Sequence, residues 1–379
     1  MAPISDTRLI HGGIDGDAAT GAVSVPIYQT STYRQKALGE LTSKYEYSRT
    51  ANPTRDALES LIAELEGGVA GFAFASGLAA TTAVLLLFAT GDKLLLSSNV
   101  YGGTFRLLDR VFRPFGLQYE IVDMRDLAAV QAALTPDVAG VILESPTNPL
   151  LEVTDIAAVA ALAKAQGALT IVDNTFLTPY LQRPIELGAD IVLHSATKYL
   201  GGHSDLIAGL AVVNTPELAE RLHFLQNAAG GVLPPHDAWL LVRSIKTLGV
   251  RMERHMENAR FVVDHLRRHP AVERVYFPDN ELNARQAAGP GAMVSFVLRE
   301  GYDAPTFFRS VRLITLGESL GGVESLMTHP ASMTHAAIPA AIRARVGIVD
   351  HLARLSVGLE SREDIVADLD LAIEAARMR

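Results

Sequence analysis

Lys198 is the residue whose position in this sequence most strongly suggests covalent chemistry. It follows an apolar, β-branched stretch, 189–193, and the small hydroxyl residues Ser195 and Thr197. A lysine is rarely placed beside a buried strand, because taking an ammonium group out of water is costly. A Schiff base to an aldehyde is the chemistry that best tolerates such a lysine. Of the six lysines in the chain, only Lys198 ends a predicted core strand, although taken alone it could be a surface residue in a loop.

Asp173 supplies a second group that this chemistry needs. It ends another apolar strand, 168–172, and lies 25 residues before Lys198. Pyridoxal phosphate requires a lysine for the Schiff base and an anion that keeps its ring nitrogen protonated, which makes the ring an electron sink. An aspartate before Asn174 is also ordinary turn chemistry, so Asp173 alone would indicate no more than a turn. Together the two residues predict a pyridoxal-phosphate site.

The phosphate and the ring of this cofactor need further partners, and three segments offer them. Ser195 and Thr197 carry hydroxyl groups next to Lys198. The segment 76–78, Ser-Gly-Leu, starts an alanine-rich helix after a short apolar strand, and the first turn of a helix favours an anion. Tyr101 follows a third apolar strand and has a ring on which a flat cofactor can stack, although a tyrosine can equally anchor a turn.

Apolar runs that end in polar residues, each followed by a helical stretch, recur along the chain. This alternation predicts an α/β fold with a mainly parallel central sheet, in which ligands gather at the carboxyl ends of the strands. We expect an N-terminal arm (1–50) that contacts a neighbouring subunit, a cofactor-binding α/β domain (51–235) and a smaller α+β C-terminal domain (236–379). In the last part the pattern predicts a strand at 355–359 and a helix with a capping box at Ser361.

The stretches 173–176 and 194–199 resemble the signature around the Schiff-base lysine in one family of pyridoxal-phosphate enzymes. This is the Cys/Met-metabolism group, which includes cystathionine γ-synthase, cystathionine γ-lyase, cystathionine β-lyase and methionine γ-lyase. The resemblance extends from 10–13 to 354–358 and covers nearly the whole chain. It implies fold type I of the pyridoxal-phosphate-dependent transferases, a homotetramer built from two active dimers, and γ-elimination or γ-replacement on sulfur amino acids.

The same resemblance implies a role for each matching residue. Lys198 holds the cofactor and moves protons during the reaction, Asp173 pairs with the ring nitrogen, and Tyr101 stacks on the ring. Further cofactor contacts are expected at Ser76, Gly77, Leu78, Ser195 and Thr197 of the same subunit, and at Tyr47 and Arg49 of a neighbouring subunit. Substrate contacts are expected at Asn148, Ser319, Arg354, Glu318 and Arg106.

Glu318 and Arg106 favour a cystathionine-type substrate within this family. In the cystathionine enzymes an acidic residue precedes the Ser-Leu-Gly-Gly motif, as Glu318 does here, and the two charges suit a substrate with a second amino and carboxylate group. Methionine γ-lyases resemble each other in a cysteine near Gly103, and this chain has no cysteine. We therefore expect C–S cleavage of the cystathionine γ-lyase type. Replacement on O-acylhomoserine, as in cystathionine γ-synthase, and methionine γ-lyase activity are the alternatives.

Composition argues against several other classes of protein. A net charge of −9 and a pI near 5.7 argue against nucleic acid or an anionic membrane as a partner. The lack of cysteine removes disulfides and thiolate metal sites, and we interpret His265 and His269 as solvated side chains, so no metal is expected. The longest apolar run, 78–90, is too short to cross a membrane and no apolar leader is visible, so we expect a cytoplasmic location.

Two functions from other classes stay open. One is a nicotinamide oxidoreductase on a similar sheet, but the glycine-rich segment 289–294 lacks the third glycine of a dinucleotide fingerprint and precedes a strand. The other is a relative of the fold that has lost catalysis and acts as a binding or regulatory protein. Such a relative would lack the yellow colour of a lysine-bound cofactor.

Overall fold

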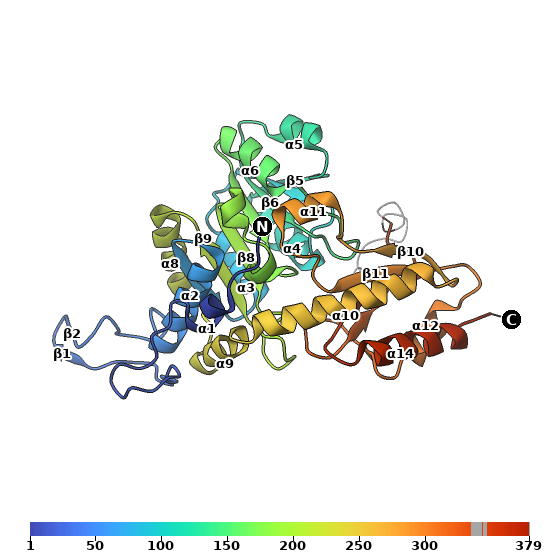
Figure 1. Cartoon of the computed structure of the whole chain (residues 1–379). Coiled ribbons are helices and arrows are strands. Elements are labelled where there is room, and N and C mark those ends of the chain that lie inside the picture. The colour runs from blue at the N-terminus through green and yellow to red at the C-terminus, as the bar shows by residue number, and fades with distance from the viewer. Residues whose placement is uncertain (335–342, 344–346, 379) are drawn as a thin grey trace.

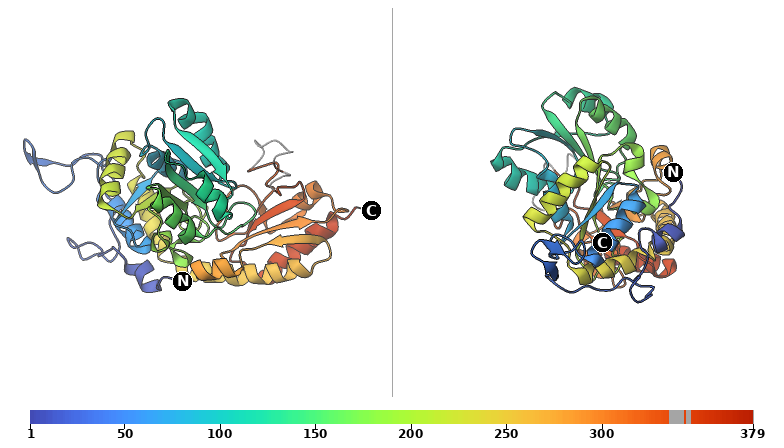
Figure 2. Two further views of the ribbon diagram at one scale, coloured as in Figure 1. Left: turned by 90° about the horizontal axis from the view of Figure 1, so that it is seen from above. Right: turned by 90° about the vertical axis from the view of Figure 1, so that its left-hand side faces the viewer.

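In the computed structural model, which describes residues 1–334, 343 and 347–378, the chain forms two large β-sheets with helices packed on them and a short two-stranded hairpin. The two sheets lie beside each other, and one long helix, α10 (Leu248–Arg268), runs along both (Figure 1). A narrow N-terminal segment extends away from this body (Figure 2).

The larger sheet has seven strands in the order β3-β9-β8-β7-β6-β4-β5, and the neighbours from β8 to β5 are all parallel. Within this sheet β9 runs antiparallel to both of its neighbours. The strands are β3 (Ala70–Phe74), β4 (Lys93–Ser97), β5 (Gln118–Val122), β6 (Val138–Glu144), β7 (Leu169–Asp173), β8 (Ile191–Ser195) and β9 (Gly209–Val213). The prediction of a mainly parallel central sheet is confirmed.

Helices cover both faces of this sheet, which explains why its central strands are apolar at almost every position. On one face, Ile171 and Leu193 pack with α3 and α8, and on the other face Val141 and Val172 pack with α5 and α6. The helices of this part are α2 (Pro53–Glu66), α3 (Gly77–Leu85), α4 (Gly102–Leu107), α5 (Leu127–Ala133), α6 (Ile156–Ala165), α7 (Thr178–Leu181), α8 (Pro216–Ala229) and α9 (Pro235–Ile245).

The smaller sheet has five strands in the order β10-β11-β14-β13-β12, of which β12 and β13 are parallel and the others antiparallel. Helix α10 contacts this sheet and α14 on one side and α1 and α7 on the other, so it connects the two halves of the molecule. The elements are β10 (Val272–Tyr276), α11 (Glu281–Gln286), β11 (Met293–Leu298), α12 (Ala304–Ser310), β12 (Thr315–Leu316), β13 (Leu326–Thr328), β14 (Leu352–Ser356) and α14 (Arg362–Ala375).

The N-terminal segment has one anchored part and one extended part. Helix α1 (Asp6–His11) contacts α2 and α10, and the amide of Ile4 donates to the backbone oxygen of Tyr180 at 3.2 Å. The hairpin of β1 (Gln35–Ala37) and β2 (Glu40–Leu41) extends away from the body (Figure 1). Val23 and Leu38 in this extended part are almost fully exposed.

Two local predictions in the C-terminal part are wrong. Strand β14 begins at Leu352 and not at 355, so Arg354 lies within the strand. Ser361 precedes α14, but its side chain makes no capping bond and instead donates to the carboxylate of Glu363 at 3.0 Å. The two sheets fall on either side of residue 235, while the domain boundaries themselves stay predictions.

Candidate active site

A cavity of about 330 Å³ lies where the carboxyl ends of the parallel strands face the smaller sheet. Side chains from both sheets line it, so it is built by segments far apart in the sequence. The predicted site residues that the structure brings together here are Ser76, Gly77, Leu78, Tyr101, Asn148, Asp173, Ser195, Thr197, Lys198, Glu318, Ser319 and Arg354.

The amino end of α3 forms one wall of the cavity. Ser76 precedes the helix, and its Oγ accepts a hydrogen bond from the amide of Ala79 at 3.1 Å. Gly77 lies so close to β8 that a Cβ atom there would be 3.1 Å from both Cα and Cβ of Ser195. The free amides and the positive end of the helix dipole therefore lie beside the hydroxyl of Ser195, which is a suitable environment for a phosphate.

Asp173 is held in place by a threonine two residues further on. Its Oδ1 accepts hydrogen bonds from the amide of Thr175 at 3.0 Å and from the hydroxyl of Thr175 at 2.5 Å. The same hydroxyl oxygen accepts the amide of Ser195 at 2.8 Å. Burial raises the pKa of Asp173, and the hydrogen bonds from Thr175 lower it. Thr175 thus joins the predicted ring-nitrogen partner to the predicted phosphate loop.

Lys198 lies between the two sheets. Its Nζ donates a hydrogen bond to Oγ of Ser319 at 2.7 Å. Burial lowers the pKa of Lys198 to about 8, the positive charge of Arg354 lowers it further, and Glu318 acts in the opposite direction. With this pKa a far larger fraction of the amine is neutral near neutral pH than in an ordinary lysine, and the neutral form is the one that acts as a nucleophile or base.

Arg354 forms a buried clamp on the side of the smaller sheet. Its Nη1 donates to Oδ1 of Asn148 at 2.7 Å, and its Nη2 donates to the backbone oxygen of Ser319 and to Oγ1 of Thr328, both at 3.1 Å. Its Nε has no hydrogen-bond partner among the described residues. Burial lowers the pKa of Arg354 to about 10, so the guanidinium stays charged near neutral pH and can bind an anion.

Tyr101 lies at the mouth of the cavity, at the start of α4. Its amide donates to Oε2 of Glu144 at 3.1 Å, and its ring packs on Gly103, where a Cβ atom would lie 2.3 Å from the ring. Burial and the neighbouring charge of Asp173 raise the pKa of Glu144 well above its ordinary value. The ring of Tyr101 is partly exposed, as expected for a side chain that stacks on a ligand.

Three predicted residues do not line the cavity. Tyr47 and Arg49 lie in the N-terminal segment, with the guanidinium 5.6 Å from the ring centroid, and Arg49 donates to the backbone oxygen of Asn227 at 2.9 Å. Arg106 is exposed on α4. The structure therefore places Arg106 outside the cavity of its own subunit, and its role at a substrate carboxylate stays a prediction.

Thr175, Glu144 and Thr328 contribute to the site but received no role from the sequence. Glu144 carried a signal, since it is a polar residue directly after a core strand, whereas Thr175 lies in what reads as an ordinary turn. Thr328 carried no local signal, because it reaches Arg354 through the pairing of β13 with β14. The contribution of Thr328 becomes visible only when two strands that are distant in the sequence are paired.

The interpretation of His265 and His269 as solvated side chains is wrong. Within the described part of the chain they form the one group that could hold a metal ion, together with Asp370 of α14. Nε2 of His265 lies 2.7 Å and Nε2 of His269 lies 3.6 Å from Oδ1 of Asp370. The amide of Ala271 donates to Nδ1 of His269, which leaves the ring proton on Nε2, facing the carboxylate. This is the geometry of a polar cluster that joins α10 to α14.

Comparison with known proteins gives the family of this chain. Residues 6–374 match the family described as Cys/Met metabolism PLP-dependent enzyme. The chain belongs to this family. It is 54% identical to a cystathionine beta-lyase of Lactococcus lactis subsp. cremoris over 97% of this chain and 98% of the relative. It is 53% identical to a cystathionine gamma-lyase of Bacillus subtilis (strain 168), with the same coverage of both chains. A solved structure of cystathionine gamma-lyase from Lactobacillus plantarum, complexed with L-serine, superposes with a TM-score of 0.95 at 54% identity and covers 98% of each chain.

As a member of this family, the chain is an enzyme that uses pyridoxal phosphate as its cofactor and has fold type I. The residues present fit that cofactor: Lys198 has a lowered pKa, Asp173 offers a carboxylate, and Gly77 leaves the helix end open to a phosphate. The two alternative functions, a nicotinamide oxidoreductase and a non-catalytic relative of the fold, are therefore wrong. In the described part of the chain, no helix combines the length and apolar character needed to cross a membrane, while the cytoplasmic location stays a prediction.

Proposed function

We propose that this enzyme cleaves cystathionine at its γ-carbon and releases cysteine, 2-oxobutyrate and ammonia. The observation that carries the proposal is the position of Glu318, whose carboxylate lines the same cavity as Lys198 and Arg354. Cystathionine has an ammonium group at the end distant from the reacting carbon, and Glu318 forms no ion pair among the described residues that would occupy its carboxylate.

We assign each remaining group of the cavity one task. Arg354, oriented by Asn148 and Thr328, lines the cavity and binds the α-carboxylate of the substrate through its guanidinium group. Lys198 holds the cofactor and then carries a proton away from Cα, with Ser319 directing its amine. Bound pyridoxal phosphate supplies the electron sink, which the carboxylate of Asp173 supports at the ring nitrogen. Tyr101 covers the ring from the mouth of the cavity.

Two neighbouring reactions are the main alternatives. Replacement on O-acylhomoserine uses the same side chains. It differs from elimination in its last stage, which an incoming thiol completes in replacement and water completes in elimination. Methionine γ-lyase activity is less well supported, because the ring of Tyr101 fills the space beside Gly103 that a cysteine side chain would need. Cleavage on the β side is a further possibility, since a cystathionine beta-lyase and a cystathionine gamma-lyase resemble this chain almost equally.

We propose that the active unit is at least a dimer, assembled into a tetramer, in which Tyr47 and Arg49 reach the phosphate site of the neighbouring subunit. Two observations support this. Neither residue lines the cavity of its own chain, and the extended segment that carries them exposes Val23 and Leu38. Packing of these side chains against a neighbouring subunit would remove their apolar surface from water. Sedimentation at several protein concentrations measures the assembly.

Product analysis tests the reaction. The holoenzyme is incubated with cystathionine, and 2-oxobutyrate with cysteine is distinguished from pyruvate with homocysteine. Methionine, homocysteine, and O-acetylhomoserine with cysteine are assayed in parallel. We expect 2-oxobutyrate from cystathionine with the highest kcat/KM. A preference for pyruvate, for methionine or for the replacement reaction would contradict the proposal.

A further inference from the structure

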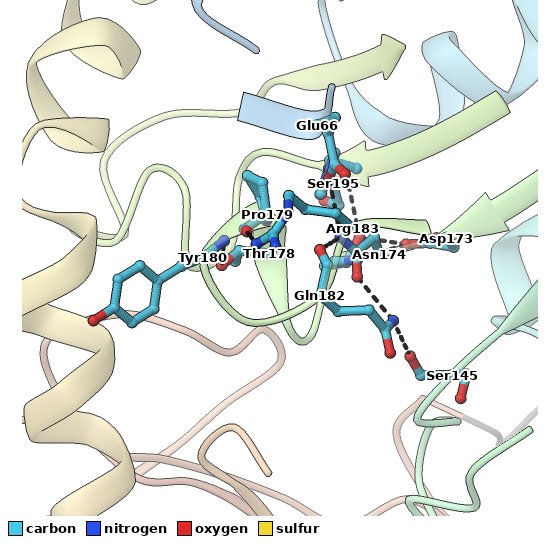
Figure 3. A network of polar contacts seen from close by, with 12 residues as sticks. Glu66, Ser145, Asp173, Asn174, Thr178, Pro179, Tyr180, Gln182, Arg183 and Ser195 are labelled. Carbon is cyan, nitrogen blue, oxygen red and sulfur yellow. Dashed lines mark hydrogen bonds and ion pairs between the residues drawn. The ribbon is translucent and has the colours of Figure 1, made fainter. Parts of the chain in front are cut away.

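The ends of β6, β7 and β8 are joined by buried side chains on the face of the sheet opposite the cavity. Nε2 of Gln182 donates to the backbone oxygen of Ser145 at 2.9 Å and to Oδ1 of Asn174 at 3.1 Å. Nδ2 of Asn174 donates to Oε1 of Glu66 at 2.9 Å, and the same oxygen lies 2.6 Å from Nε2 of His194. Figure 3 shows the chain of contacts from Glu66 to Ser145. We call these five residues the rear network.

Members of the rear network alternate with cavity residues along the chain. Asn174 lies between Asp173 and Thr175, and His194 directly precedes Ser195. Successive side chains of a strand point to opposite faces of the sheet, so a contact on the rear face fixes its neighbour on the cavity face. His194 borders the cavity, yet Nε2 of its ring is directed to a helix behind the sheet.

Complete burial of two ionisable side chains, Glu66 and His194, is unusual if they serve only to fill the core. Both side chains are fully buried, and Oε2 of Glu66 and Nδ1 of His194 have no partner in the described part of the chain. Burying ionisable groups that are only partly paired is costly, and apolar residues of similar shape often stabilise such a position equally well. Burial raises the pKa of Asp173, the hydrogen bonds from Thr175 lower it, and the proximity of His194 lowers it further.

We propose that Glu66 and His194 are positioning residues for the cofactor. Through Asn174 and Gln182 the rear network holds three strand ends in register and so fixes Asp173 and Ser195 on the opposite face. The inference rests on the cofactor contacts proposed above for those two residues. It predicts that a change at Glu66 alters cofactor binding although Glu66 does not line the cavity.

The test replaces Glu66 by Gln, which keeps the size and the acceptor oxygen but removes the charge. Glu59→Gln is the control, because Glu59 lies on the same helix but contacts Arg55, Ala73 of β3 and Gln226 instead of the ends of β6, β7 and β8. We expect Glu66→Gln to raise the dissociation constant of pyridoxal phosphate about tenfold and to change the visible circular dichroism of the bound cofactor. Glu59→Gln should leave both unchanged. A Glu66→Gln enzyme that differs only in melting temperature would overturn the inference.

A double-mutant cycle with Asp173→Asn separates this inference from the site assignment. If Glu66 acts through Asp173, its effect on the dissociation constant largely disappears in the Asp173→Asn background, whereas additive effects would overturn it. If Asp173→Asn alone changes neither spectrum nor affinity, the proposed role of Asp173 fails and the inference fails with it.

Should Glu66→Gln not fold, Gln182→Met carries the test, since it cuts the network between Ser145 and Asn174 without removing a charge. Unchanged affinity and spectrum in Gln182→Met would likewise overturn the inference.

Discussion

The amine of Lys198 donates a hydrogen bond to Ser319, and Ser319 has a backbone φ of 109°, a conformation that residues with a side chain rarely adopt. Its backbone oxygen accepts a bond from Arg354, so the strained residue is held from two sides. Strain of this kind persists only where the surroundings fix it, and it is typical of functional sites. Here the strained conformation places the hydroxyl of Ser319, in a loop of the smaller half, beside the amine of Lys198, which follows a strand of the larger sheet.

Replacing Lys198 by Ala should abolish the covalent attachment of the cofactor and lower kcat by several orders of magnitude. The cavity has no second lysine among its lining residues to take over the task. Lys164→Ala, at an exposed position on α6, is the control and should behave like the parent enzyme. The visible absorbance band and its loss on borohydride treatment are the measurements. A normal band and rate in Lys198→Ala would refute the assignment.

The rate at which the apoenzyme captures pyridoxal phosphate should rise with pH, with a midpoint near pH 8, and level off at higher pH. Only the neutral amine attacks an aldehyde, and burial places the pKa of Lys198 at about 8 instead of the ordinary 10.5. The neutral fraction therefore increases with pH and reaches one half near pH 8. Stopped-flow absorbance measures the rate, with a small free amine as the reference for titration of the cofactor itself. A midpoint near 10.5 would mean that the amine is solvated.

Replacing Thr175 by Val should weaken cofactor binding about tenfold, which corresponds to about 1.4 kcal/mol. The substitution keeps the shape but removes the hydroxyl that bonds both Asp173 and the amide of Ser195. Thr175→Ser restores the hydroxyl and should restore most of the affinity. Titration of the apoenzyme with cofactor gives both dissociation constants. A loss in Thr175→Ser with none in Thr175→Val would point instead to packing of the methyl group.

Mixing an Arg49→Ala variant with a Lys198→Ala variant should restore part of the activity that each lacks alone. If Arg49 acts in a neighbouring subunit, a hybrid dimer contains one site with both residues intact. Subunit exchange is verified by mass spectrometry of differently tagged chains, and activity is followed over the same period. Demonstrated exchange with no recovery of activity would place Arg49 and Lys198 of the same chain in one site.

Replacing Glu318 by Val should raise KM for cystathionine about ten- to a hundredfold more than KM for methionine. This range corresponds to about 1–3 kcal/mol, the usual loss for one charge-assisted hydrogen bond. Arg106→Ala is a useful comparison, because Arg106 lies outside the cavity of its own subunit. If Glu318→Val affects both substrates equally, Glu318 does not recognise the distal ammonium group.

The parts of the site that could be predicted from the sequence are those marked by local pattern. Lys198, Asp173 and Tyr101 each follow an apolar strand, and parallel strands bring such ends to one edge of a sheet. Ser319 and Arg354 were implied only by the resemblance, because their approach depends on how the smaller sheet lies against the larger one. A pattern of neighbouring residues does not reveal how two sheets lie against each other.

The errors have the same origin. Arg354 looked like a residue before a strand because a charged side chain inside a buried strand is rare, and only its partners Asn148 and Thr328 make the position possible. His265 and His269 looked solvated because nothing within α10 reveals that α14 packs on them. In each case a contact between distant segments outweighed the local preference.

Helix α10 has a consequence for how the chain can be divided. The lysine and the aspartate of the cavity belong to the part of the chain before this helix, whereas Ser319 and Arg354 come after it. A fragment that ends before α10 would retain the groups for the cofactor and lack the clamp for a carboxylate. Split at this helix, the enzyme would consist of two incomplete halves, and activity on mixing them would report their reassembly.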